Sequence, residues 1–291
     1  MTRVLSVVIP TRNRQKILMT TLRALAVQRG LEGGFEVIVA DDGSVDGSIE
    51  LLRGSVFEAF DLRVLALDAG GPARARNRAI AEASADRVLV LGDDTVPTPN
   101  ALAVHMRMAG NREVAVQGRI EWDPDHPVTD FMSYLAPAGP QFWFRGLADG
   151  GPVGWTQILG SNLSAPTRWF RLEAYDERFS DACMEDTELA YRWHRRGWTA
   201  VWSDRALCYH RHRYDDAGPF LDRQRRAGHW ARLAVSKNPG MIFKVVAQPL
   251  LTTPWKAVRT GGRRLIGRAD QVDRWDLQCR AAFFRGFFLG L

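Results

Sequence analysis

Cysteine is scarce in this sequence of 291 residues, and its three copies, Cys183, Cys208 and Cys279, lie far apart. An odd and scattered set does not support a disulfide framework, so reduced thiols in a cytoplasm are expected. The chain also lacks a run of ~18 uninterrupted apolar residues, which a membrane-spanning helix would need. Its N-terminus leads straight into an apolar, strand-like segment without the regions of a signal peptide. These absences argue against secreted disulfide-rich proteins and integral membrane proteins.

Glycine-rich phosphate-binding loops are missing as well. No G-x-G-x-x-G follows the first strand-like segment, and no G-x-x-x-x-G-K-[ST] occurs. If phosphates bind, the sequence therefore favours a metal held by carboxylates. The missing loop argues against a sugar nucleotidyltransferase, which stays an alternative. Lysine is absent between Lys16 and Lys237, which argues against a phosphoacceptor receiver domain because that domain needs a lysine downstream of its aspartate.

Basic residues outnumber acidic ones, with a net charge of +6 and a sequence pI of about 9.6. The arginines crowd the last third, in LDRQRRAGHWAR and VRTGGRRLIGR. Because no nucleic-acid-binding module accompanies them, no nucleic-acid partner is expected. A solvated basic face or a patch that contacts an anionic membrane remains.

Strand-like and helical segments alternate over the first 120 residues. The apolar runs LSVVIP, FEVIVADDGS, LRVLALDAGG and DRVLVLGDD are separated by helical segments, and EVAVQGRIEW is expected to be a fifth strand. Such alternation predicts a mostly parallel sheet with right-handed crossovers. Ligands of these sheets bind beyond the carboxyl ends of the strands. The polar stretches PTRNR, DDGS and GDD follow three strands, so we expect them to meet in one crevice.

Two adjacent carboxylates, Asp93 and Asp94, follow the fourth strand. Neighbouring carboxylates repel each other, and a hard divalent cation, Mg²⁺ or Mn²⁺, would neutralise them while also binding substrate phosphates. The alternative is a helix-capping cluster beside Thr95. The metal interpretation predicts a phosphate-bearing substrate.

Seven motifs in order resemble an inverting family-2 glycosyltransferase with the GT-A fold. The resemblance implies an α/β nucleotide-diphospho-sugar transferase fold, with a mostly parallel central sheet flanked by helices and a helical C-terminal extension. It divides the chain into a catalytic domain at 1–215, with a nucleotide-binding half at 1–120 and an acceptor-binding half at 121–215, and the extension at 216–291. Where the family often has three acids or D-x-D, this chain has Gly92 before its two acids. The motifs are SVVIPTRNR, VIVADDGSVDGS, AGGPARARNRAI, LVLGDDTVPTP, GSNLSAPTRWF, MEDTELAYRWHRRGW and CYHRH.

The resemblance also implies a donor site, for a nucleotide-diphosphate sugar. Of the two acids after the second strand, Asp42 is implied to accept a hydrogen bond from the nucleotide base, and support of the turn is the alternative for Asp41. Two other members have simpler alternatives: Pro10 as the residue that ends a strand, and Arg76 as a solvated helix arginine. The implied donor-site residues are Pro10, Thr11, Arg12, Asp41, Asp42, Arg76, Asn77, Asp93, Gly160, Ser161 and Asn162.

For the metal, Mn²⁺ or Mg²⁺, the resemblance implies Asp94 and His210 as ligands. Cys208 beside two histidines also suggests zinc, but a fourth ligand at suitable spacing is absent. A structural histidine is the further alternative. The metal would neutralise the charge that develops on the departing nucleoside diphosphate.

Asp186 is implied as the general base that takes the proton of the acceptor hydroxyl, with Glu185 as the second candidate. The alternative for both is helix capping, because carboxylates stabilise a helix N-terminus. A single displacement with one base inverts the anomeric configuration. The implied activity is transfer of a sugar to a glycan, polysaccharide or lipid-linked acceptor, and a non-catalytic nucleotide-sugar-binding protein is the competing hypothesis.

The last segment, CRAAFFRGFFLGL, places aromatic and apolar side chains on one helical face. It is too short to span a bilayer, but a basic amphipathic helix can lie in the interface of an anionic membrane, here the inner face of the cell membrane. Packing on the catalytic domain or homodimer formation is the alternative. The face comprises Phe283, Phe284, Phe287, Phe288 and Leu291.

Overall fold

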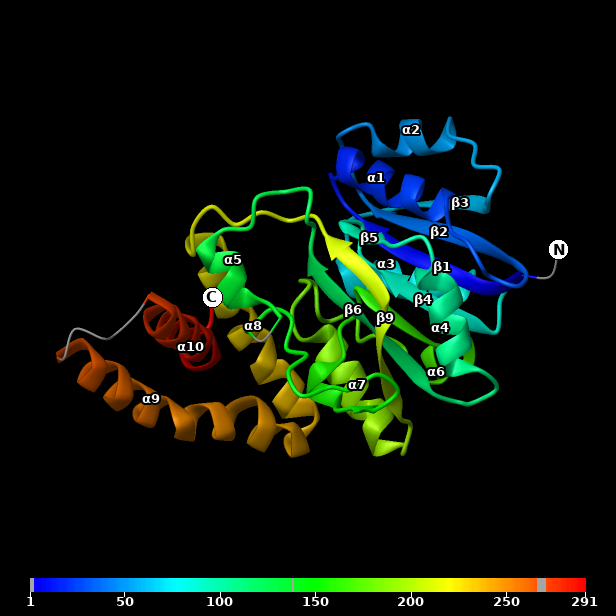
Figure 1. Cartoon of the computed structure of the whole chain (residues 1–291). Coiled ribbons are helices and arrows are strands. Elements are labelled where there is room, and N and C mark those ends of the chain that lie inside the picture. Colours follow the sequence, from blue (N-terminus) through cyan, green and yellow to red (C-terminus); the bar gives the residue numbers. More distant parts are fainter. Residues whose placement is uncertain (1–2, 138, 266–270) are drawn as a thin grey trace.

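A mixed sheet forms the centre of the molecule. The computed structural model describes residues 3–137, 139–265 and 271–291. Over these residues the sheet has nine strands in the order β3-β2-β1-β4-β8-β6-β9-β5, and β7 pairs with β9. Helices lie on both sides of it (Figure 1). The strands are β1 (Arg3–Thr11), β2 (Gly34–Asp42), β3 (Asp61–Leu67), β4 (Arg87–Leu91), β5 (Thr95–Pro97), β6 (Ala115–Trp122), β7 (Pro152–Val153), β8 (Asn162–Pro166) and β9 (Ala200–His210).

The helices connect the strands in the N-terminal part and gather at one side of the sheet in the C-terminal part (Figure 1). Short 3-10 turns and one π-helical segment occur at residues 155–157, 239–241 and 243–247. The α-helices are α1 (Gln15–Ala26), α2 (Ser48–Arg53), α3 (Pro72–Ala81), α4 (Ala101–Ala109), α5 (Asp130–Leu135), α6 (Thr167–Leu172), α7 (Glu185–Arg195), α8 (Gly218–Lys237), α9 (Gln248–Leu265) and α10 (Gln271–Leu289).

The N-terminal half of the sheet is parallel, as the alternation of segments predicts. Strands β3, β2, β1 and β4 pair in parallel. The other half is mixed: β8 runs antiparallel to β4 and β6, β5 runs antiparallel to β9, and β6 and β9 are parallel. The expected α/β fold is confirmed, but the sheet is mixed: outside the first half only β6 and β9 pair in parallel among the described strands. Hydrophobic periodicity predicts strands, but it carries no information about the direction in which distant strands pair.

The sheet is buried on both faces in its parallel half. Along β1, Leu5, Val7 and Ile9 pack into one core with α1 and α4, and Val8 packs into the other with α3 and α7. Successive side chains of a strand point to opposite faces, so a continuous apolar run fills two cores at once. This two-sided burial fixes where β1, β2 and β4 end, and hence where their polar termini meet.

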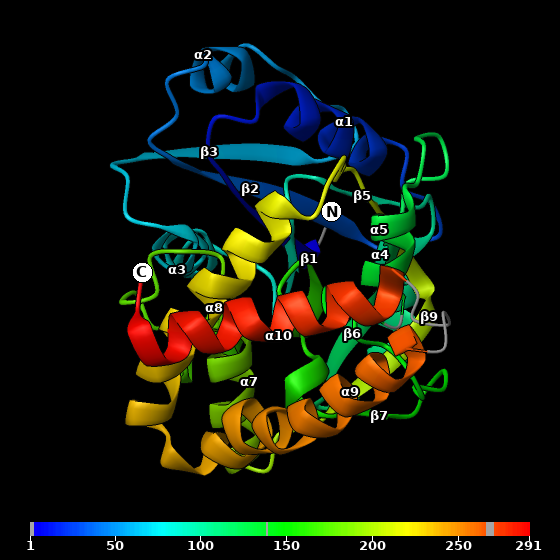
Figure 2. The ribbon, with the colours of Figure 1, turned by 90° about the vertical axis from the view of Figure 1, so that its left-hand side faces the viewer.

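Helix α10 packs directly on α8 (Figure 2). The crossing depends on two glycines: a Cβ at Gly286 would lie 1.8 Å from the carbonyl oxygen of Arg225, and one at Gly228 would lie 1.9 Å from that of Phe283. Phe283, Phe284 and Phe287 are half-buried, as the packing alternative for this segment expects. Phe288 remains exposed.

Membrane-spanning character is missing from the helices that the structure describes, because none is both long and apolar enough to cross a bilayer. The end of the second arginine-rich segment, at 266–268, lies outside the described residues.

Gly286→Ala should lower the free energy of unfolding by about 1–3 kcal/mol, because the added methyl group would force α8 and α10 apart. The control is Gly54→Ala, where the nearest atom to an added Cβ is 3.6 Å away. That variant should be neutral or slightly more stable, because alanine reduces the entropy of the unfolded chain. Urea unfolding measures both. Equal effects of the two substitutions would show that the helix crossing is not tight.

Candidate active site

A crevice lies beyond the carboxyl ends of the parallel strands, as the sequence predicts. Its volume is about 440 Å³. The stretches after β1, β2 and β4 all reach it, through Thr11, Asp42 and Asp93. The lining residues are Pro10, Thr11, Arg12, Arg14, Asp42, Gly71, Pro72, Arg76, Gly92, Asp93, Asp94, Gln141, Ser161, Ser180, Asp181, Ala182, His210, His212, Tyr214 and Arg223.

The acidic pair lies in a tight turn between β4 and β5. The hydroxyl of Thr11 donates a 2.8 Å hydrogen bond to the Asp93 carboxylate, and the hydroxyl of Thr21 donates one of 2.7 Å to the Asp93 carbonyl oxygen. A Cβ at Gly92 would lie 2.6 Å from Oγ1 of the buried Thr95. The turn therefore needs glycine where relatives of the resembled family often carry a further acid.

Arg14 is a functional candidate that the sequence analysis missed. Its Nη1 lies 3.0 Å from Asp93 Oδ1 and 2.5 Å from Asp94 Oδ2. Burial would lower the pKa of Arg14, but the two carboxylates outweigh that effect and raise it. The only signal in the sequence is the second arginine of PTRNR, which looks like any solvated cation at a helix start. The structure thus places a cation of the chain itself between the two acids.

The two acids differ in the direction in which their pKa values are shifted. Burial, together with the neighbouring Asp94, raises the pKa of Asp93 to about 6. Burial also acts on Asp94, but His210 and Arg14 outweigh it and lower the pKa of that carboxyl. Asp94 is therefore the acid that stays ionised over the wider pH range.

His210 lies beside Asp94 because β5 and β9 pair with Thr95 opposite His210. Its Nε2 is 3.4 Å from Asp94 Oδ1, and its buried Nδ1 has no hydrogen-bond partner among the described residues. Burial lowers the pKa of His210 to about 4, so the imidazole is neutral near pH 7. A neutral imidazole beside a carboxylate suits a divalent metal.

Protein ligands for such a metal are few. The described part of the chain contains no group of three or more His, Cys, Asp or Glu residues placed to hold a metal ion. Asp94 and His210 would therefore supply two positions and leave the others to water or to substrate oxygens. Cys208 does not join them: it lies in an apolar core, and burial raises the pKa of its thiol. The zinc interpretation therefore has no support in this geometry.

A second charged cluster borders the crevice where α3 meets the start of α7. Arg76 is only 6% exposed, so the interpretation as a solvated helix arginine is wrong. Its Nη1 lies 2.7 Å from Glu185 Oε1 and 3.5 Å from Asp186 Oδ1. Burial raises the pKa of Glu185 to about 7, with a further contribution from Asp186. Because Arg76 lies on α3 and both acids lie on α7, this buried cluster forms only when the two helices are packed together.

Asp186 is the more accessible of the two acids, with 17% of its side chain exposed against 3% for Glu185. The amide of Gly160 donates a 2.8 Å hydrogen bond to Asp186 Oδ2, and a Cβ at Gly160 would lie 2.3 Å from Asp186 Oδ1. Oδ1 itself is buried and has no hydrogen-bond partner among the described residues. Neither acid lines the crevice directly; Arg76 lies between them and it.

Several predicted donor-site residues have structural hydrogen bonds instead of an open position. Asn77 bonds the backbone at Tyr175, and Asn162 bonds two backbone carbonyls and His105. The Asp41 carboxylate accepts the Ser44 amide, as turn chemistry expects. The donor-site residues that do line the crevice are Pro10, Thr11, Arg12, Asp42, Arg76, Asp93 and Ser161.

Other segments also line the crevice through residues that were not predicted. They include Gln141, Ser180, Asp181, Tyr214 and Arg223. Arg223 comes from the arginine-rich start of α8, where the sequence does not distinguish a crevice residue from its solvated neighbours.

Asp42 lies opposite Arg12 in the crevice. Its carboxylate accepts hydrogen bonds from the backbone amides of Gly70 and Gly71.

Comparison with known proteins identifies the family of the chain. Residues 6–179 match the profile of the family described as Glycosyl transferase family 2. The chain belongs to glycosyl transferase family 2. One curated relative is a validoxylamine A glucosyltransferase of Streptomyces hygroscopicus subsp. limoneus, which is 30% identical over 220 residues, or 66% of this chain and 48% of that protein. Another is a chondroitin synthase of Escherichia coli, which is 31% identical over 238 residues, or 71% of this chain and 34% of that protein. The chain thus spans about half or less of the length of these family-2 relatives.

Solved structures show the same fold. One is the mannosyltransferase PcManGT from Pyrobaculum calidifontis in complex with GDP-Man and Mn²⁺. It superposes with a TM-score of 0.68 at 16% sequence identity, and the match covers 100% of this chain and 88% of the mannosyltransferase chain. S. aureus TarS, residues 1–349, in complex with UDP, has a TM-score of 0.55 at 17% identity, with 99% and 92% covered. The expected GT-A fold with a helical C-terminal part is confirmed.

Proposed function

We propose that this family-2 chain transfers a sugar from a nucleotide-diphosphate sugar to an acceptor hydroxyl, by a metal-dependent single displacement. The observation that carries the proposal is that Asp94 and His210 line the same crevice that Arg76 connects to the Glu185–Asp186 pair. One side of the crevice suits a metal-bound diphosphate. On the other side, Arg76 lies between the crevice and the carboxylates of Glu185 and Asp186, one of which would take the proton of an attacking hydroxyl.

The donor is proposed to lie along the ends of β1 and β2, against Thr11, Arg12 and Asp42. Asp94 and His210 would hold Mn²⁺ or Mg²⁺. When bound, the metal would neutralise negative charge on the departing nucleoside diphosphate. Solved structures of similar fold support this: the mannosyltransferase PcManGT is in complex with GDP-Man and Mn²⁺, and TarS has been solved with UDP and with UDP-GlcNAc.

Asp186 is proposed as the base. Its side chain is better exposed than that of Glu185, and its Oδ1, which lies 3.5 Å from Arg76 Nη1, has no hydrogen-bond partner among the described residues. Arg76 holds both carboxylates in place and is a positioning residue for them. Glu185 stays the second candidate because burial keeps its pKa near neutrality.

The proposed division has the catalytic domain at 1–215, with halves at 1–120 and 121–215, and the C-terminal extension at 216–291. Acceptors in the class of glycans, polysaccharides and lipid-linked saccharides are consistent with the family. A cytoplasmic location, with peripheral contact of the extension to the membrane, remains part of the proposal.

A panel of UDP-, GDP- and dTDP-sugars tests the function. The protein should release nucleotide from at least one donor with Mn²⁺ present, and chelation with EDTA should stop the release. Metal-independent release would contradict the metal assignment. Binding of a sugar nucleotide without any turnover, with and without acceptors, would favour the non-catalytic alternative.

The product should carry the inverted anomeric configuration, because one base and one displacement leave no covalent sugar intermediate. The ¹H NMR coupling constant of the anomeric proton, read on the first product formed from an α-linked donor, should report a β-linkage. A retained α-configuration would exclude the single displacement.

A further inference from the structure

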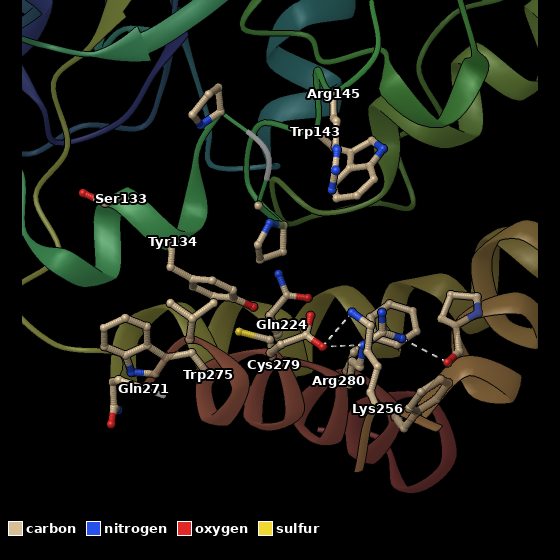
Figure 3. A pocket seen from close by; sticks show the side chains of 18 of the residues that line it. Ser133, Tyr134, Trp143, Arg145, Gln224, Lys256, Gln271, Trp275, Cys279 and Arg280 are labelled. Carbon is tan, nitrogen blue, oxygen red and sulfur yellow. Dashed lines mark hydrogen bonds and ion pairs between the residues drawn. The ribbon is translucent and has the colours of Figure 1, made fainter. Parts of the chain in front are cut away.

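A second cavity lies under the C-terminal helices and has no role in the proposed chemistry. Its volume is about 930 Å³, within the range of about 300–1,000 Å³ that small-molecule sites occupy. Helices α5, α8, α9 and α10 and the segment before η1 (Trp155–Gln157) contribute to it (Figure 3). We call it the C-terminal pocket. Its apolar and aromatic lining residues are Tyr134, Pro137, Pro140, Trp143, Val245, Pro249, Val272, Trp275, Phe283 and Phe284.

The C-terminal pocket backs directly onto the crevice. Pro140 lines the pocket and the next residue, Gln141, lines the crevice; on α8, Gln224 lines the pocket and Arg223 lines the crevice. The two spaces therefore lie next to each other at two places along the chain.

The charged groups of the pocket are largely paired with one another. Asp276 accepts from Lys256 at 2.8 Å and from Arg280 at 3.2 Å, and Arg280 also donates to the Pro249 carbonyl at 3.0 Å. Figure 3 shows Trp143 and Arg145 across the space from this group. Asp130 and Arg145 line the pocket as well, and most of the remaining lining is apolar or aromatic.

We propose that the C-terminal pocket binds the hydrocarbon portion of an amphiphilic acceptor whose sugar lies in the crevice. The proposal rests on the proposed function, because it is the acceptor hydroxyl that must reach the crevice. A single hydrocarbon chain fits the lining: it needs burial of apolar surface and few hydrogen-bond partners.

The apolar residues on the outer face of α9 supply a second, competing surface. Leu251 and Trp255 are 71% and 69% exposed and lie four residues apart on one face of that helix. A hydrocarbon chain or a membrane could contact this face instead of entering the pocket. The experiment therefore has to separate the pocket from the outer face.

The probes are n-hexyl, n-octyl and n-decyl β-glucosides, titrated calorimetrically below their micelle concentrations. Affinity should rise roughly fourfold per methylene, the equivalent of about 0.8 kcal/mol. Val272→Asp, on the pocket wall and 47% exposed, should weaken n-decyl glucoside binding at least tenfold. Ser133→Trp, which fills the pocket from an exposed position on α5, should do the same and replaces Val272→Asp if that variant misfolds.

Val27→Asp is the matched control, at a valine 54% exposed at the end of α1, and it should bind like the unsubstituted protein. Affinity that does not depend on chain length, or equal losses in Val272→Asp and Val27→Asp, would overturn the proposal. Loss in Trp255→Asp alone would assign binding to the outer face of α9 and overturn it as well. Since alkyl glucoside binding needs no sugar nucleotide, a failed donor panel contradicts the proposed function and leaves this result intact.

Discussion

Asp94→Asn should reduce metal-dependent nucleotide release at least roughly 10³-fold, because metal stabilisation of the leaving group is worth several kcal/mol. Asparagine keeps the size of the side chain and an oxygen for Arg14 and His210, so the turn should survive. Binding of Mn²⁺, followed by electron paramagnetic resonance in the presence of the donor, should weaken in parallel.

The matched control is Glu36→Gln, at a buried carboxylate on the same sheet but at the opposite end of its strands, bonded to Ser6 and Ser84. That variant should keep a near-normal rate at temperatures where it is folded. Normal metal-dependent turnover by Asp94→Asn would contradict the assignment of Asp94 as metal ligand.

Asp186→Asn should lower kcat by roughly 10² to 10⁴, the range for loss of a general base. The Gly160 amide can still donate to the asparagine oxygen, and Arg76 keeps its bond to Glu185, so the local structure should persist. Donor affinity should change little, because Asp186 does not line the crevice. Steady-state kinetics on the donor found by the panel, with donor binding measured separately, checks both statements.

Glu185→Gln is the comparison that distinguishes the two acids. It removes a carboxylate from the same cluster, yet it should leave a larger share of kcat than Asp186→Asn does, since Glu185 is nearly inaccessible. The reverse order, with Glu185→Gln inactive and Asp186→Asn active, would make Glu185 the base.

The N-terminal fold was predictable because it follows from local chemistry. Apolar runs in β1, β2 and β4 are long enough to be buried on both faces, and their flanking polar stretches mark where they end. Because these strands are parallel, their carboxyl ends lie at one edge of the sheet, and Thr11, Asp42 and Asp93 therefore lie close together. The direction of β8 and β5 depends on pairing between distant segments, and the sequence carries no local signal for it.

The site was predictable only in part, for a related reason. Carboxylates stand out in a sequence when they are adjacent, but the partners of Arg14 and Arg223 are set through space. Arg14 looks like a solvated helix-start residue until β4 brings Asp93 and Asp94 to it. The same holds for Asn77 and Asn162, whose amides satisfy buried backbone groups that no sequence motif records. The C-terminal pocket is formed by the packing of α10 on α8, which depends on two glycines in different helices.

The pairing of β5 with β9 has a consequence for how the protein folds. This ladder places Thr95 opposite His210, and the backbone amide of Arg211 donates to the Asp94 carbonyl at 2.8 Å. The β4–β8 and β6–β9 ladders join segments that are likewise far apart in the chain. Such high contact order slows folding, because the entropy of long loops is lost before the strands pair. Asp94 and His210 therefore come together no earlier than this ladder does, and substitutions that weaken it should slow the gain of metal-dependent activity during refolding more than the gain of helical signal.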